Sequence, residues 1–175
     1  MDNGRVERHI PDPGFAGDDG TADPGVRSAL AGLADEPAAY GDALLALQDA
    51  RLLVPVVAIL GEVEVDEHGL AHDKTSDMAA VLMTGADGRR ALLAFTGSDS
   101  LAAWDDGARP VPVPTRQAAQ SAVQDGAAAL VVDIAGPATA VVEGDDLTRL
   151  AAGWRVVRLQ DGRGDQLGWI GPAAE

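Results

Sequence analysis

The segment that decides the fold is ALLALQDARLLVPVVAI, residues 43–59, which is followed after a polar stretch by DMAAVLMTGADGRRALLAFTG, residues 77–97. The first string begins with leucines at helical spacing and runs directly into a continuous apolar segment, a pattern typical of a helix followed by a buried strand. The second string holds two apolar segments, 77–84 and 89–96, on either side of a glycine-bounded turn. This arrangement predicts a β-hairpin.

One proline interrupts the first apolar strand. Pro55 lies in the middle of residues 51–59. Proline has no backbone N–H and is therefore found mainly on edge strands. We expect this strand to lie near the edge of its sheet.

Polar residues mark the starts of three expected helices. Asp35 precedes a segment with Pro37 in its first turn, Ser98 precedes a short helix, and Thr115 precedes a helix over 116–125 that is closed by a glycine. Asp, Ser and Thr are favoured caps because their side-chain oxygens accept a free backbone N–H of the first turn. The remaining expected elements are a short helix from Val26, strands at 128–134 and 139–142, a helix at 145–152, and a hairpin of 154–159 with 166–170.

Helices and strands interleave without a regular strand–helix–strand repeat. The sequence therefore predicts an α+β or mixed α/β fold, a single domain with helices packed on a mixed sheet. Residues 1–25 are rich in Gly, Pro and Asp and are expected to form a disordered acidic tail. The domain is expected over 26–153, and residues 154–175 form a C-terminal hairpin or extension.

Composition limits the functions open to this chain. A formal charge of −15 disfavours nucleic acid and anionic membranes as partners. The absence of cysteine excludes disulfides, thiolate metal sites and cysteine nucleophiles. The first residues lack the apolar segment of a signal peptide, and no apolar run approaches the ~20 residues of a membrane span. We expect a cytoplasmic protein.

The strings quoted above, together with ARPVPVP at 108–114 and the short helix after it, resemble a known family. They are similar to the SseB protein N-terminal domain, of the enhanced serine sensitivity type, which is widespread in actinobacteria. The resemblance covers roughly residues 26–153. It implies a mixed α/β fold with no established catalytic residue and no cofactor.

Residues 68–73 contain the best candidate for a metal site. His68, His72 and Asp73 supply two imidazoles and a carboxylate, which are ligands that zinc accepts. Their spacing falls in a glycine-containing loop rather than on a helix that would align the two imidazoles. A solvated loop explains these residues better, so we expect no bound metal.

Three further patterns fall short of catalytic motifs. Ser98 follows a strand and opens a helix, but the Gly-x-Ser-x-Gly pattern of a nucleophile elbow is missing. The glycines of 162–168 do not match the dinucleotide fingerprint and fit a hairpin turn. The acidic pairs at 105–106 and 145–146 fit exposed helix ends, where a carboxylate rarely has the shifted pKa that acid–base catalysis needs.

The sequence therefore favours a non-enzymatic cytoplasmic interaction or regulatory module that binds a protein partner. We expect the partner to contact an edge strand near Pro55 or at 110–114, or the region of Arg90, Trp104 and Arg116, because Trp and Arg are enriched at interface hot spots. The alternative is a small-molecule sensor or enzyme, with an anionic ligand held by Arg90 and Arg116. Neither hypothesis requires a cofactor, and the sequence does not identify the partner or the oligomeric state.

Overall fold

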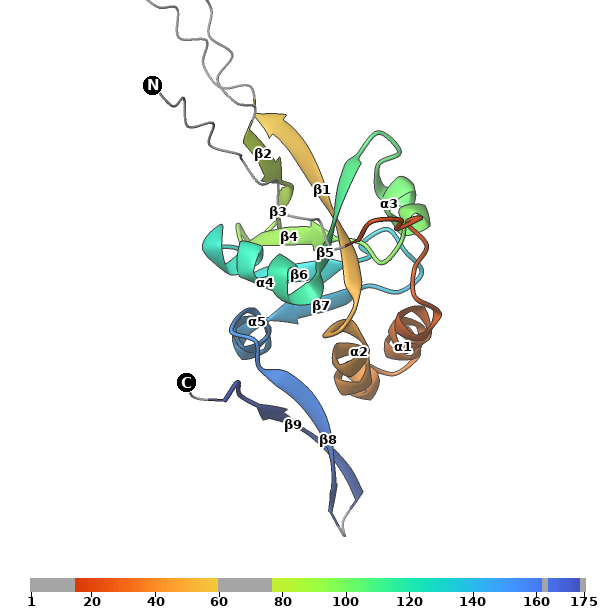
Figure 1. Cartoon of the computed structure of the whole chain (residues 1–175), viewed down its shortest axis with the longest axis vertical. Coiled ribbons are helices and arrows are strands. Elements are labelled where there is room, and N and C mark those ends of the chain that lie inside the picture. Colours follow the sequence, from red (N-terminus) through yellow and green to blue (C-terminus); the bar gives the residue numbers. More distant parts are fainter. Residues whose placement is uncertain (1–14, 60–76, 162–163, 174–175) are drawn as a thin grey trace, which may run out of the picture.

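The computed structural model of the chain describes residues 15–59, 77–161 and 164–173 (Figure 1). Within these residues, helices pack on a three-stranded antiparallel sheet and a four-stranded mixed sheet, and a separate hairpin follows them. This arrangement confirms the predicted α+β fold class. The helices are α1 (Pro24–Asp35), the 3₁₀ helix η1 (Pro37–Ala39), α2 (Tyr40–Leu47), α3 (Ser98–Trp104), α4 (Thr115–Gln124) and α5 (Gly144–Ala151). The strands are β1 (Arg51–Ile59), β2 (Asp77–Ala80), β3 (Leu82–Thr84), β4 (Arg90–Ala94), β5 (Arg109–Pro114), β6 (Ala129–Val132), β7 (Ala140–Glu143), β8 (Arg155–Asp161) and β9 (Gly164–Ile170).

Strand β1 lies in the middle of a three-stranded sheet of order β2-β1-β5, so the prediction that Pro55 marks an edge is wrong. Pro55 is paired in register with Pro110 of β5. The neighbouring Leu53 exchanges backbone hydrogen bonds with Phe95 on the other side of β1, at 2.8 and 2.9 Å. Because backbone groups alternate along a strand, Pro55 also directs its nitrogen away from β5. The ladder with β5 therefore loses no donor.

The strand predicted at 77–84 changes sheets at Val81. Its first half, β2, pairs with β1, and its second half, β3, pairs with β4. The Val81 N–H donates to the carbonyl of Pro55 at 3.0 Å, and its carbonyl accepts from Leu93 at 3.3 Å. The predicted turn at 85–88 is confirmed, with Gly88 at φ 80°. One residue thus joins the two sheets.

The four-stranded sheet has the order β3-β4-β6-β7, and β4 and β6 are parallel. Alternate residues of these two strands face two separate cores. Leu92 and Leu130, both 0% exposed, face the larger core, which α1, α2, α4 and α5 cover. Leu93 and Val131 face the smaller core around Phe95. This alternation follows from the pleat, which directs successive side chains to opposite faces.

The predicted helices are present, but the predicted caps are wrong. Asp35 is the last residue of α1, and the following 3₁₀ helix has no side-chain cap. Ser98 is the first residue of α3, and Gly97 occupies the N-cap position before it. The Gly97 N–H donates a hydrogen bond to the Ser100 hydroxyl at 3.4 Å. The Thr115 hydroxyl donates to the carbonyl of Ala50, the residue before β1, at 3.1 Å. Of the three predicted caps, only the Thr115 side chain forms a tertiary hydrogen bond in place of a local one.

The described structure begins upstream of the expected start at Val26. Helix α1 starts at Pro24, and Asp23 caps it by accepting the Val26 N–H at 3.0 Å. Ala22 is only 5% exposed. Arg51 of β1 pairs with Asp18 at 2.6 Å. Residues 18–23 therefore pack on the domain, and residues 1–14 of the expected tail lie outside the described residues.

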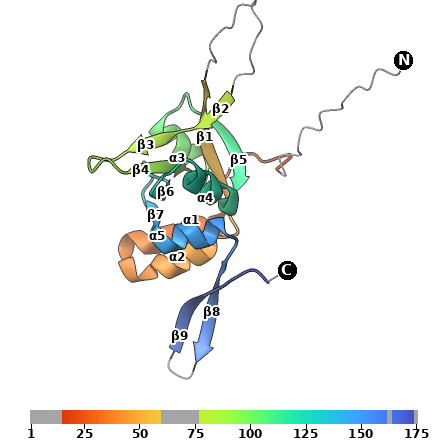
Figure 2. The same cartoon turned by 90° about the vertical axis from the view of Figure 1, so that its left-hand side faces the viewer.

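The predicted C-terminal hairpin is also observed. Strands β8 and β9 pair antiparallel over seven residues each, and both views show them extending away from the body beyond α2 and α5 (Figure 2). Across the described residues, no helix is both long and apolar enough to cross a membrane.

Candidate functional site

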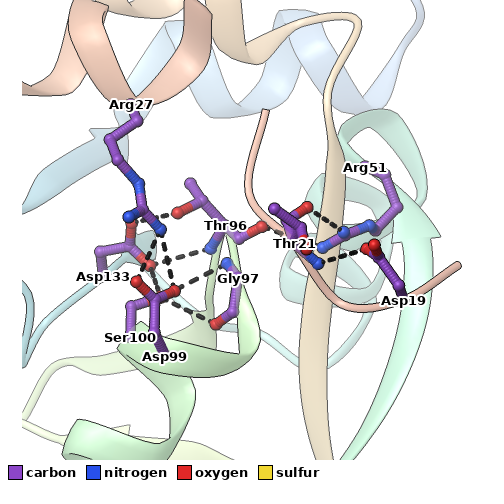
Figure 3. Close-up of polar contacts among 9 residues, drawn as sticks. All are labelled: Asp19, Thr21, Arg27, Arg51, Thr96, Gly97, Asp99, Ser100 and Asp133. Carbon is purple, nitrogen blue, oxygen red and sulfur yellow. Dashed lines mark hydrogen bonds and ion pairs between the residues drawn. The ribbon is translucent and has the colours of Figure 1, made fainter. Parts of the chain in front are cut away.

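A cleft lies at the carboxyl ends of the parallel strands β4 and β6. In sheets with parallel strands, ligands bind in the crevice outside these carboxyl ends. Here Thr96 and Gly97 follow β4, and Asp133 follows β6 directly. Helix α1 and helix α3 flank the same place, where Figure 3 shows Arg27, Ser100 and Asp133 side by side. We call this feature the β4–β6 cleft.

The β4–β6 cleft has a volume of about 390 Å³, which is the size of a small-molecule site. Its walls are mainly alanine and proline side chains from α1, α3 and the β6–β7 loop, and its polar groups come from four charged residues and one serine. The lining residues are Arg27, Leu30, Ala31, Ala34, Asp35, Asp99, Ser100, Ala103, Asp133, Ala135, Gly136, Pro137 and Ala138.

Asp133 forms the floor of the cleft and is only 6% exposed. Its Oδ1 accepts from the Thr96 N–H at 2.8 Å and from the Ser100 hydroxyl at 2.6 Å, and its Oδ2 accepts from the Thr96 hydroxyl at 2.6 Å. Its φ of 56° lies in the left-handed region, which Asp tolerates better than most residues. A buried carboxylate is therefore held by three donors of the β4–α3 turn.

The rim of the cleft carries an ion pair. Arg27 Nη2 lies 2.8 Å from both carboxylate oxygens of Asp99. Partial burial acts to raise the pKa of Asp99, but the hydrogen bonds from Arg27 and from the Ser100 N–H outweigh it and lower that pKa below 3.8. Asp99 is therefore ionised at neutral pH and engages the guanidinium that the cleft contains.

The structure does not bring Arg90, Trp104 and Arg116 together. The Arg90 guanidinium donates to the Asp125 carbonyl at the end of α4, at 2.8 Å. Arg116 lies at the start of α4, with its Cζ 2.8 Å from where a Cβ atom on Gly153 would be. The ten residues of α4 separate these two ends by about 15 Å. Two arginines at opposite ends of a helix do not form a shared anion site.

Trp104 packs in the smaller core rather than beside either arginine. Its ring centroid lies 5.5 Å from that of Phe95, and it is half-buried against Leu101 and its neighbours. Arg89, the neighbour of Arg90 in sequence, pairs with Asp87 and Glu143 at 2.6 and 2.9 Å. The residues that we expected to form one binding region are thus dispersed over the domain.

The weak metal candidates His68, His72 and Asp73 lie outside the described residues. Where the structure does describe the chain, it contains no group of three or more His, Cys, Asp or Glu side chains arranged to hold a metal ion.

A second candidate surface is the C-terminal hairpin. Val156 and Trp169 form one cross-strand pair and face the body, where Val156 is 4% exposed. The opposite face carries Val157, Leu159 and Ile170, and we call it the outward face. Leu159 is 50% and Ile170 56% exposed. Isolated two-stranded hairpins are marginally stable in water, so this one needs support from the body.

The support comes from polar contacts with α2, α5 and the residues after α2. Gln48 donates to the Val156 carbonyl at 3.0 Å and accepts the Val156 N–H at 2.8 Å, as a neighbouring strand would. Asp146 of α5 accepts from the Trp169 ring N–H at 3.1 Å and from the Tyr40 hydroxyl at 3.2 Å. Burial and the Asp146 charge raise the pKa of Tyr40, so its hydroxyl remains a donor.

Side-chain packing adds to these polar contacts. The Leu167 side chain lies so close to Gly41 of α2 that a Cβ atom there would collide with it. Arg155 pairs with Asp49 at 2.7 Å, and Arg158 pairs with Asp42 at 2.7 Å. One face of the hairpin is thus docked on the body, and the other face is left uncovered in the described structure.

Sequence reasoning missed both surfaces. The sequence placed Asp133 inside the strand predicted at 128–134, whereas β6 ends at Val132, and the partners Thr96 and Ser100 are distant in sequence. The available signal was a single aspartate near the end of an otherwise apolar predicted strand. The outward face gave no signal, because alternation predicts a hairpin and does not say which face a body covers.

The structure is that of a small α+β domain with two candidate surfaces, the β4–β6 cleft and the C-terminal hairpin. The chain belongs to the SseB family: the model of the SseB protein N-terminal domain matches residues 26–149, more than half of the 175 residues. This finding confirms the resemblance drawn from the sequence. A search of curated proteins and a search of solved structures each found no match.

Proposed function

We propose that this SseB-family chain is a non-enzymatic cytoplasmic interaction module, which binds a protein partner by adding a strand to the outer edge of β9. The observation that carries the proposal is the C-terminal hairpin, whose outward face carries three apolar side chains, Val157, Leu159 and Ile170, and whose outer β9 edge is unpaired among the described strands. Strand addition derives affinity from main-chain hydrogen bonds and specificity from alternate side chains.

The pattern of backbone hydrogen bonds identifies the groups that are open to a partner. Val156 bonds through both backbone groups to Gln48, so its pair with Trp169 is a pair without ladder hydrogen bonds. By alternation, Asp165, Leu167 and Trp169 direct their N–H and C=O groups away from β8. In the described sheet, no strand lies on that side of β9. The β9 edge, defined by these three residues, therefore presents three donors and three acceptors.

The chemistry of the partner follows from charge and from the outward face. A chain with a formal charge of −15 repels a second copy of itself, and it attracts a basic protein. The partner segment is thus an extended strand with alternate apolar side chains, flanked by Lys or Arg. Nucleic acid and anionic membranes are not expected partners, because the same charge repels them.

The alternative function, a sensor or enzyme with an anionic ligand held jointly by Arg90 and Arg116, gains no support from geometry. The two guanidinium groups lie at opposite ends of α4.

The test is affinity purification of the tagged full-length chain from its own host, with a matched pair of proline variants. Asp165→Pro removes an outward donor from β9, and Gln160→Pro removes one from β8 at the directly opposite position. We expect Asp165→Pro to reduce partner recovery at least tenfold and Gln160→Pro to leave it near wild type, while circular dichroism shows both variants folded. Equal recovery with both variants, or loss with Gln160→Pro alone, contradicts binding at the β9 edge.

The tail is tested in the same purification by a chain that starts at residue 15. Removal of all of residues 1–25 is unsuitable, because Asp18 and Asp23 hold Arg51 and the start of α1. Partner recovery that is unchanged without residues 1–14 assigns binding to the described domain. Recovery that is lost with those residues moves the site to the tail and overturns the proposal.

A further inference from the structure

The β4–β6 cleft is a second binding feature, separate from the C-terminal hairpin. Its walls are apolar, since alanines from α1, α3 and the β6–β7 loop line it together with Leu30 and Pro137. Its floor is the buried carboxylate of Asp133. An apolar cavity with a few convergent polar groups is the usual form of a small-molecule site. Its position beyond two parallel strands is independent support, because ligands favour that crevice.

The charges of the cleft select the charge of the ligand. Three carboxylates, those of Asp35, Asp99 and Asp133, face one guanidinium, that of Arg27. Arg27 is already engaged by both oxygens of Asp99. Asp35 and Asp133 form no ion pair within the described residues. The cleft therefore carries an uncompensated negative charge, which favours a cation and repels a carboxylate or phosphate.

The hydrogen bonds of Asp133 leave a place for such a cation. A carboxylate can accept about four hydrogen bonds. Asp133 accepts two on Oδ1, and only the Thr96 hydroxyl donates to Oδ2 among the described groups. The three bonds fasten the β4–α3 turn, and one acceptor position on Oδ2 remains. A protonated amine can fill that position and adds a charge that none of the three existing donors carries.

We propose that the β4–β6 cleft binds a small molecule that joins an apolar body to a protonated amine. The amine contacts the Asp133 carboxylate, and the apolar body lies between Ala31 of α1 and Ala103 of α3. The volume of about 390 Å³ is sufficient for a chain or ring of several carbon atoms. A small molecule bound here would sit under α1 and thus close to the first described segment of the chain.

The test uses hexylamine, with hexanol and hexanoate as probes of equal length, added to the ¹⁵N-labelled full chain at pH 7. We expect hexylamine to shift the amide signals of Ser100, Ala103 and Asp133 with a saturating curve in the millimolar range, since small ligands have limited affinity. Hexanol should bind at least tenfold more weakly, and hexanoate more weakly still. Equal shifts with hexanol and hexylamine overturn the amine assignment, and shifts elsewhere overturn the site.

Two matched variants locate the site without disturbing Asp133. Ala103 and Ala102 are consecutive exposed residues of α3, but only Ala103 lines the cleft. Ala103→Phe fills the cleft and should weaken hexylamine at least tenfold, whereas Ala102→Phe should leave its affinity within twofold. Unchanged binding in Ala103→Phe contradicts the proposal. A third variant, Asp133→Asn, removes the negative charge of the carboxylate. If this variant does not fold, the comparison of Ala103→Phe with Ala102→Phe tests the site by itself.

Discussion

Strands β5 and β9 are both edge strands, yet they present opposite surfaces to a partner. Pro110, Pro112 and Pro114 occupy alternate positions of β5, and their pairs with β1 lack ladder hydrogen bonds. Their nitrogens therefore face the free edge and offer no donor. The β9 edge offers donors at Asp165, Leu167 and Trp169. Natural proteins use proline to prevent edge-to-edge pairing, so the β5 edge is closed to strand addition and the β9 edge is open.

The difference also explains why we propose the β9 edge for partner binding instead of the edges expected from the sequence. The sequence directed attention to Pro55 and to residues 110–114, because prolines mark edges. Pro55 lies in the central strand, and residues 110–114 form an edge that cannot donate. Proline reveals an edge strand in the sequence, and the same proline removes the backbone donor that a partner strand would need. An unblocked edge, such as that of β9, carries no such mark.

The largest expected effect is the difference in free energy of unfolding between a substitution in the interior of the body and one on the outward face of the hairpin. Asp133→Ala removes the acceptor of three buried hydrogen bonds and should lower the free energy of unfolding by about 3–5 kcal/mol. Leu159→Asp, on the outward face, should change it by less than about 0.5 kcal/mol and abolish partner recovery. Urea unfolding of both variants measures this contrast. A Leu159→Asp loss of similar size would mean that the outward face is covered within the chain.

The attachment of the hairpin is a smaller, local effect. Gln48→Ala removes both hydrogen bonds to Val156 and should cost about 1–2 kcal/mol, because that edge of β8 then faces only water. Amide exchange at Val156 should accelerate, while exchange at Leu92 in the body stays unchanged. Gln120→Ala, which removes one hydrogen bond to Ala151, serves as the control. Unchanged Val156 exchange would contradict a hairpin fastened by Gln48.

The closed edge of β5 can be opened by one substitution. Pro112→Val restores an outward N–H in the middle of β5 and should change stability by less than about 1 kcal/mol. We expect the variant to self-associate at high protein concentration and high salt, which screens the repulsion between chains. Sedimentation velocity measures the change, with Val113→Ile as a control that keeps the prolines. A monomeric Pro112→Val chain would show that something other than proline closes this edge.

The smallest expected effect is electrostatic. The hydrogen bond from Arg155, together with its charge, lowers the pKa of Asp49 below 3.8 despite partial burial. The folded chain then binds this proton less readily than the unfolded chain, so the stabilisation is present above pH 3.8 and is lost as the pH falls through the lowered pKa. Because both side chains are largely exposed, the pair contributes less than about 1 kcal/mol. Urea midpoints of Asp49→Asn and wild type should differ at pH 6 and converge as the pH falls below 3.8 and through the lowered pKa. A constant difference would contradict this origin.

Local sequence patterns predicted the helices and strands well, but they did not predict the contacts between residues that are distant in sequence. The helix and strand at 43–59 and the hairpin at 77–97 follow from spacing and turn residues that lie within a few positions of one another. The sheet change at Val81 depends on partners from two other strands. The role of Asp133 depends on Thr96 and Ser100, which come from a different part of the chain. Single-sequence patterns cannot register such distant partners.

The most direct test of the account is amide hydrogen exchange of the chain with and without its purified partner, read residue by residue along β9. Strand addition predicts an alternating result: exchange slows at least tenfold at Leu167 and Trp169, whose N–H groups face outward, and changes little at Gly168, whose N–H group already faces β8. Protection that is uniform along β9, or that appears on α4 or β5 instead, would contradict binding at the β9 edge.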